Sequence, residues 1–156
     1  MQTLWRTVAG VCGAYARAMA SLAKHQAPGM APEEREALVR ERFHVVLAVQ
    51  QYAKFADPAR GSYSAHQVAA VEGLLAAFGD WLSIAYIDEE ADAHGARRYF
   101  SCMVDRECPP IAHGPDAPPG MRRPKFRVEL PGFPILGHGK SDNQNCAIVF
   151  TRGEVL

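Results

Sequence analysis

Three stretches in the middle of the chain decide its fold: residues 43–50 read FHVVLAVQ, residues 65–78 read AHQVAAVEGLLAAF and residues 81–87 read WLSIAYI. The first is a near-continuous, valine-rich run that is typical of a strand buried on both faces, and the third is a second β-prone run. The stretch between them repeats apolar residues at the spacing of one helix face, and Ser64 before it is a favourable N-cap. A strand, a helix and a strand joined by short links form a βαβ unit, whose right-handed crossover predicts parallel strands.

The residues before this unit predict a helical lead-in over residues 1–42. Apolar side chains at spacings of three and four favour a helix over residues 7–24. Pro32, with two glutamates directly after it, predicts a second helix that ends near Arg42. We therefore interpret the chain as a helical lead-in followed by an α/β part over residues 43–156.

Further strands are expected after the βαβ unit. Residues 99–104 form a third strand candidate, and residues 125–130 (KFRVEL) alternate polar and apolar side chains as a half-exposed strand should. Residues 146–151 (CAIVFT) predict the last strand, whereas the proline-rich residues 108–120 predict an irregular surface loop. The predicted fold class is α/β, with a βαβ core, further strands and N-terminal helices.

Composition limits the classes of function. Lysine and arginine number 17, aspartate and glutamate also number 17, and the formal net charge is zero. A dedicated nucleic-acid binder normally carries a basic excess, so we expect no nucleic-acid partner. No stretch approaches the ~18 uninterrupted apolar residues of a membrane span, so we expect no transmembrane segment in this chain.

Polar residues follow both strands of the βαβ unit. Directly after the second strand come Asp88, Glu89 and Glu90, and just past the first come Gln50, Gln51 and Lys54. Ligands bind beyond the carboxyl ends of strands in open α/β sheets, so these groups could meet a uracil edge, a ribose or a phosphate. An acid there could also hold a divalent cation on a diphosphate. The simpler alternative is a charged strand exit and a polar loop that meet solvent.

A third candidate site is the stretch GHGKSDNQN at residues 137–145. Its glycines can expose backbone N–H groups and Lys140 adds a positive charge, which suits a phosphate. A P-loop is excluded because Pro134 stands where its first glycine is needed. The polar residues that follow the lysine are Asp142, Asn143, Gln144 and Asn145. Such amides entering a core must be hydrogen-bonded, either to the backbone or to a ligand.

Cysteine chemistry is a weaker hypothesis. Cys102, Cys108, His113 and Cys146 contain zinc-binding atoms, but their spacing matches no standard zinc site. Cys146 with His113 or His138 could form a nucleophile pair of a small thiol hydrolase. A cysteine that opens a strand is more often a small buried apolar residue.

Four ordered blocks of the sequence resemble one known family. The longest is RPKFRVELPGFPILGHGKSDNQNCAIVFTRGE at residues 123–154, and the others are residues 2–10, 43–55 and 84–90. Together they closely resemble the β-1,3-glucan (callose) synthases of fungi and plants, glycosyltransferase family 48. Residues 27–41 and 108–120 are loops outside the resemblance.

The resemblance implies a partial glycosyltransferase-A-like (Rossmann-like) domain that binds a nucleotide sugar. Enzymes of this family transfer glucose from UDP-glucose to a β-1,3-glucan chain with inversion, at the cytosolic face of the plasma membrane. This chain would then be a fragment, inactive alone, whose general base and membrane helices belong to the remainder of the synthase polypeptide. The resemblance also suggests a small GTPase as regulator and leaves room for a divalent cation beside the donor UDP-glucose.

The same resemblance implies roles for individual residues. Asp88 would contact the uridine, and Lys54 and Lys140 would neutralise the diphosphate. Asn143, Gln144 and Asn145 would fix the donor or the loop, with Arg152 beside them, and Glu89 and Asp142 are counted among the substrate-binding residues. The family normally has histidine where this chain has Cys146, so no role of that imidazole transfers. The alternative is a non-catalytic interaction or regulatory module derived from the same fold.

Overall fold

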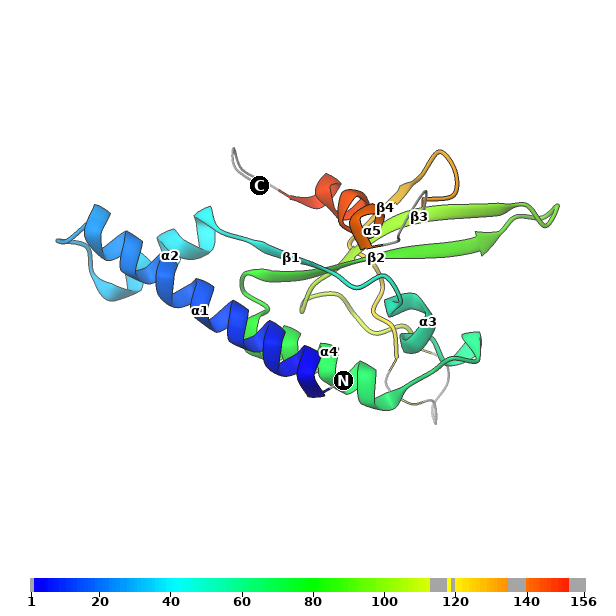
Figure 1. The fold of residues 1–156 in the computed structure, drawn as a ribbon, viewed down its shortest axis with the longest axis horizontal. Helices are drawn as coiled ribbons and strands as arrows, with labels where there is room; N and C mark the ends of the chain where they lie inside the picture. The colour runs from blue at the N-terminus through cyan, green and yellow to red at the C-terminus, as the bar shows by residue number, and fades with distance from the viewer. Residues whose placement is uncertain (1, 113–117, 119, 135–139, 152–156) are drawn as a thin grey trace.

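The computed structural model describes residues 2–112, 118, 120–134 and 140–151 (Figure 1). Its first two helices, α1 (Gln2–Gln26) and α2 (Pro32–Arg42), form a hairpin at one end of the molecule. Both predicted helices are confirmed, and α2 begins at the proline that fits the first turn of a helix. At the opposite end, the β2–β3 hairpin extends away from the body.

A mixed four-stranded sheet with the order β1-β2-β3-β4 forms the centre of the molecule. Its strands are β1 (Val45–Ala48), β2 (Leu82–Ala91), β3 (Arg97–Val104) and β4 (Phe126–Glu129). β1 and β2 are parallel, with Val45 opposite Leu82 and Ala48 opposite Ala85. The remaining two pairs are antiparallel. The predicted parallel βαβ unit is therefore confirmed.

Helices lie on both faces of this sheet (Figure 1). On one face are α3 (Tyr52–Ala56) and α4 (Ala65–Phe78), with the short helix η1 (Pro58–Arg60) between them in the chain. The predicted bounds of α4 and its Ser64 cap are confirmed, because the Ser64 side chain accepts a hydrogen bond from the Gln67 amide. On the other face is α5 (Lys140–Ala147), where the Ser101 hydroxyl donates to the Cys146 carbonyl over 2.6 Å.

The main core lies between the sheet and the α3–α4 layer. Alternate residues of β2 and β3 point into it, and they pack on the apolar face of α4. The residues that these three elements bury in this core are Ile84, Tyr86, Phe100, Cys102, Val104, Val68, Val71 and Leu75. Leu75 is fully buried, so truncating it to alanine should cost about 2–5 kcal/mol. A second cluster of Cys12, Leu74 and Leu82 joins α1 to this layer.

The structure corrects the predicted last strand. Residues 146–151 do not form a strand: Cys146 lies in α5, and a short helix, η2 (Ile148–Phe150), follows. The apolar run is too short to distinguish a strand from a helical turn by its pattern. Ile148 and Val149 are 47% and 59% exposed, so the run does not enter the core as a buried strand would.

Two strand predictions need smaller corrections. β1 is shorter than predicted and half-buried, because it is the edge strand of the sheet rather than a strand covered on both faces. β2 is longer than predicted and continues to Ala91, so Asp88 lies inside the strand and not after it. Across the residues that the structure describes, no helix is long and apolar enough to cross a membrane.

Candidate ligand-binding site

The difference in length between β1 and β2 leaves part of one sheet edge open. The Val49 amide donates to the Ala85 carbonyl over 2.7 Å, and beyond this bond the chain turns into α3. β2 runs on alone to Ala91 along this edge. A cavity of about 970 Å³ lies between the open edge of β2 and α3. This volume is at the upper end of the range of small-molecule sites.

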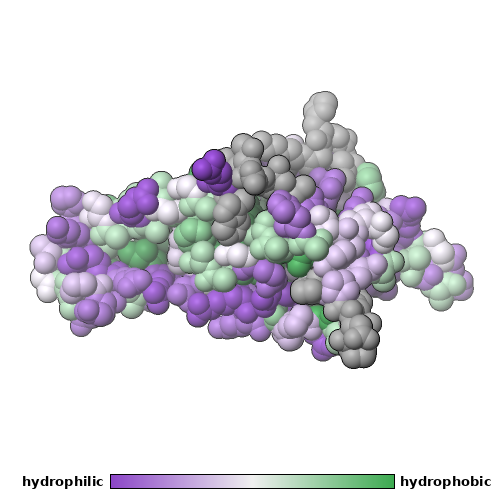
Figure 2. Space-filling view, turned by 90° about the horizontal axis from the view of Figure 1, so that it is seen from below, coloured by the Kyte–Doolittle hydropathy of each residue, from purple (hydrophilic) through white to green (hydrophobic). Residues whose placement is uncertain are grey.

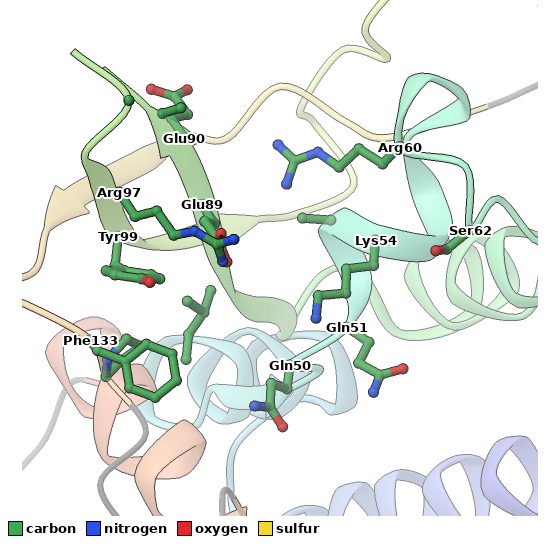
Figure 3. A pocket seen from close by; sticks show the side chains of 15 residues that line it. Gln50, Gln51, Lys54, Arg60, Ser62, Glu89, Glu90, Arg97, Tyr99 and Phe133 are labelled. Atoms are coloured by element: carbon green, nitrogen blue, oxygen red, sulfur yellow. Dashed lines mark hydrogen bonds and ion pairs between the residues drawn. The ribbon is translucent and has the colours of Figure 1, made fainter. Parts of the chain in front are cut away.

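The walls of this cavity come from three parts of the chain (Figure 3). One wall is formed by residues around α3 and η1, namely Gln50, Gln51, Ala53, Lys54, Arg60 and Ser62. The opposite wall is the β2–β3 hairpin, with Ile87, Glu89, Glu90, Ala91, Gly95, Arg97 and Tyr99. Phe133 and Pro134 complete the lining. Side chains of Lys54 and Arg60 extend across the cavity toward Glu89 and Arg97.

Arg60 is held in place by two carboxylates. Its Nη2 lies 2.6 Å from Asp88 Oδ1, and its Nε lies 3.1 Å from Asp57 Oδ2. Asp88 is only 5% exposed, and its Oδ1 also accepts a hydrogen bond from the Glu89 amide. The guanidinium is therefore fixed at the cavity wall, and the charge of the nearly buried Asp88 is compensated inside the protein.

The two glutamates after Asp88 are each paired with a different arginine. Glu89 Oε1 lies 2.6 Å from Arg97 Nη1, and Glu90 Oε1 lies 2.6 Å from Arg127 Nη2. Because these carboxylates are held by separate arginines, they do not form a cage for a divalent cation. Among the described residues, no group of three or more His, Cys, Asp or Glu could hold a metal ion.

Lys54 differs from these arginines because its side chain is exposed and forms no ion pair with any described residue. It stands on the same wall as the fixed Arg60. Across the cavity, the rings of Tyr99 and Phe133 pack edge to face, with centroids 5.3 Å apart. Two amides, Gln50 and Gln51, lie beside the lysine. This arrangement can hold an anion at one wall and a planar ring at the other.

The predicted site residues are only partly brought together. Lys54 and Glu89 line the cavity, whereas Asp88 lies behind it and reaches it through Arg60. Four others are on α5 and are not among the lining residues: Asp142, Asn143, Gln144 and Asn145. Asn143 is buried at 7% exposure, and the next two amides are exposed. The side chain of Lys140 and all of Arg152 lie outside the described part of the structure.

The sequence alone did not identify Arg60, Arg97, Tyr99 and Phe133 as lining residues. Arg60 and Phe133 lie in stretches rich in proline and glycine, where no periodicity signals which way a side chain points. Arg97 and Tyr99 are adjacent to β2 only because β3 folds back in the register that places Tyr99 opposite Glu89. The sequence alone does not give this strand register, so it could not place Arg97 and Tyr99 at the cavity.

The cysteines do not form an alternative site within the described residues. Cys102 and Cys108 are buried, while His113 and His138 lie outside the described residues. Burial, and then the nearby Asp142 carboxylate, raise the pKa of the Cys146 thiol. An activated nucleophilic cysteine needs the opposite shift.

The fold and the cavity together define a mixed α/β domain with cations and aromatic rings around an open sheet edge. A family model described as "1,3-beta-glucan synthase component" matches residues 1–156. The chain is 38% identical to the 1,3-beta-glucan synthase component FKS1 of Aspergillus niger, over 99% of this chain and 8% of that protein. It is 35% identical to the component bgs1 of Schizosaccharomyces pombe, over 99% of this chain and 9% of the relative.

A plant protein is also similar. Callose synthase 4 of Arabidopsis thaliana is 33% identical over 79% of this chain and 7% of its own length. The chain therefore belongs to the 1,3-beta-glucan synthase component family. It spans less than a tenth of the length of these relatives and corresponds to a fragment of the larger protein.

Proposed function

We propose that this chain is the sugar-nucleotide-binding part of a 1,3-β-glucan synthase and that it binds UDP-glucose in the β2-edge cavity. The observation that carries the proposal is the pair of cations, Lys54 and Arg60, on one wall of a ligand-sized cavity with two aromatic rings opposite. Family membership supports the identity of the donor. The parallel β1–α4–β2 unit supports a glycosyltransferase-A-like domain, of which this chain would supply the first part.

In this proposal the diphosphate lies against Lys54 and Arg60. Arg60 can donate to a phosphate while it stays paired with Asp88, because a guanidinium has five N–H groups. The uracil lies near Tyr99 and Phe133, and the amides of Gln50 and Gln51 meet its polar edge. Asp88 acts as a positioning residue for Arg60. The role expected for Asp88 at the uridine is thereby replaced by an indirect one.

The other site residues predicted from the sequence have a supporting role in the same proposal. Asn143, Gln144 and Asn145, with Asp142 and Arg152, would fix the donor or loop geometry, and Lys140 would help to neutralise the diphosphate. The proposal places no divalent cation at residues 88–90, because their carboxylates are each held by an arginine.

Transfer of glucose with inversion is proposed for the whole synthase and not for this fragment. An inverting transferase needs a general base for the acceptor hydroxyl and a path for the product chain. We propose that these, the membrane helices and the contact with a small GTPase belong to the remainder of the polypeptide, at the cytosolic face of the plasma membrane. The isolated 156 residues should bind the donor without turnover.

The direct test is calorimetric titration of the purified chain with UDP-glucose, UDP and glucose. We expect UDP-glucose and UDP to bind and glucose alone not to bind, because the cations recognise the diphosphate. Lys54→Gln should weaken UDP binding, whereas Lys24→Gln, a matched exposed lysine on α1, should not. Absence of UDP binding by a folded chain would refute the site. Polymer formation by the chain alone would refute its incompleteness.

The paired state of the acids favours one alternative, a non-catalytic interaction or regulatory module. Asp88 and Glu89 both have arginine partners within the chain, so the fold does not need a donor to compensate their charges. A chain that folds cooperatively, binds no nucleotide and retains affinity for the rest of the synthase would favour this alternative.

A further inference from the structure

A second cavity lies in the hairpin of α1 and α2, away from the β2-edge cavity. It has a volume of about 610 Å³, within the range of small-molecule sites. Much of its lining is apolar and comes from both helices and the start of the sheet: Tyr15, Met19, Ala20, Val39, Phe43 and Trp81. We call it the hairpin groove. Figure 2 shows hydrophobic residues at the surface of this end of the molecule, bordered by hydrophilic ones.

The apolar lining extends beyond the groove itself. A smaller cleft shares Met19, Val39 and Phe43 with it and continues between Leu22 and Leu38. Tyr15 and Leu22 are 41% and 42% exposed, which is unusual for large apolar side chains along one helix face. The smaller cleft holds only about 10 Å³, so the space for an apolar chain is the groove itself, whose apolar side, lined by Tyr15, Met19, Val39 and Phe43, we call the apolar track.

The rim of the groove carries more positive than negative charge. One cation, Arg40, is compensated, because its Nη2 lies 2.7 Å from Glu36 and 3.6 Å from Asp80. Arg17 and Lys24 also line the groove and form no ion pair with any described residue. The rim thus has two exposed cations that are available to an external anion.

Arg35 adds a polar group that lacks a partner. Its Nη2 donates to the Met30 carbonyl over 2.7 Å, but its Nε is buried and has no hydrogen-bond partner among the described residues. A buried donor without a partner costs about 1–3 kcal/mol. Arg35 also lines the groove, so its guanidinium contributes a further positive charge for an anion bound there.

We propose that the hairpin groove binds one phospholipid molecule, with its phosphate at Arg35, Arg17 and Lys24 and an acyl chain along the apolar track. The groove has the volume of a small-molecule site. A second copy of the chain is disfavoured because symmetric pairing of this face would bring its cations together. The proposal concerns a site separate from the nucleotide cavity and stands or falls independently of it.

The test uses lysophosphatidic acid below its micelle-forming concentration, with Trp81 as the reporter. Because the chain has a second tryptophan, the measurement is made in a Trp5→Phe background. We expect saturable binding with a blue shift of Trp81 fluorescence. Monoacylglycerol with the same chain, and glycerol phosphate without a chain, should each bind at least about tenfold more weakly, because each retains only half of the interaction.

Substitutions then distinguish a specific anion-binding site from non-specific electrostatic attraction. Arg35→Gln should lower the affinity about tenfold, because a charge-assisted hydrogen bond to the phosphate is lost. Arg17→Gln should lower the affinity several-fold. Arg6→Gln is the matched control, since Arg6 is an exposed arginine of the same helix that does not line the groove. Circular dichroism checks that each variant folds, and Arg35→Lys, which keeps the charge, should retain part of the affinity if Arg35→Gln does not fold.

Four results would overturn the proposal. Equal binding of monoacylglycerol would show an apolar cleft without anion recognition, and equal weakening by Arg6→Gln would show only diffuse attraction. Tighter binding of an acidic amphipathic peptide, or a dimer in sedimentation that Arg17→Gln dissociates, would assign the groove to a protein partner.

Discussion

The two cavities of this molecule both contain cations, but they hold them differently. In the β2-edge cavity, Arg60 and Arg97 are each paired with a carboxylate, and only Lys54 lacks an ion pair among the described residues. In the hairpin groove, Arg17 and Lys24 are exposed and form no ion pair with any described residue, while the lining acid, Glu36, is paired with Arg40. The comparison shows how burial changes what a cation does. A guanidinium that compensates a nearly buried acid is part of the fold, whereas an exposed one is available mainly to a ligand.

The largest expected effect is on stability. Arg60→Met leaves Asp88, 5% exposed, without its ion-pair partner, and should lower the free energy of unfolding by about 3 kcal/mol. The matched substitution in the groove, Arg17→Met, removes an exposed charge and should change the free energy of unfolding by about 0.5 kcal/mol or less. Urea denaturation measures both. Equal effects would show that the two arginines are not held differently.

The next effect tests whether the loss comes from the unpaired acid. Asp88→Asn added to Arg60→Met should restore about 1–2 kcal/mol, because a neutral amide is less costly to bury than an unpaired carboxylate. A double-mutant cycle in urea gives this coupling energy. Strict additivity of the two substitutions would mean that Arg60 stabilises the fold through other contacts.

Substituting one lysine in each cavity tests whether the two cavities bind different ligands. Lys54→Gln should weaken UDP binding about tenfold and leave lysophosphatidic acid binding unchanged, because Lys54 lines only the first cavity. Lys24→Gln should do the reverse. Calorimetry with both ligands on both variants is the measurement. Cross-effects of similar size would indicate that net charge, and not position, determines binding.

The smallest expected effect is the change in UDP affinity when a carboxylate is removed from the β2-edge cavity. Glu89→Gln frees Arg97 from its pair and removes a negative charge from the β2-edge cavity, so UDP should bind about threefold more tightly at low salt. The gain should shrink at high salt because the groups are exposed. Glu36→Gln in the groove is the control and should not change UDP affinity. Weaker UDP binding by Glu89→Gln would instead indicate that this carboxylate contacts the ligand.

Much of the local structure could be predicted from the sequence. The apolar spacing and the Ser64 cap are enough to place α4, and the two β-prone runs flanking it are enough to predict a parallel pair. The prediction at residues 146–151 was wrong because a short apolar run shows neither the helix nor the strand periodicity. Asp88 was placed after a strand because the apolar run ends at Ile87, whereas β2 continues to Ala91 with Asp88 paired to Arg60.

The sequence by itself determined the three long helices α1, α2 and α4, the βαβ unit and the family, because these depend on local periodicity and on ordered blocks of residues. Only the tertiary structure decided which charges are paired and which lack a partner. Arg60 and Asp88 are 28 residues apart in the numbering, and Tyr99 and Phe133 are 34 apart, yet each pair is in contact. Contacts of this kind are set by strand register and by the path of loops, and neither is encoded in a local pattern. The difference between a structural arginine and a ligand-binding one is therefore a property of the folded chain.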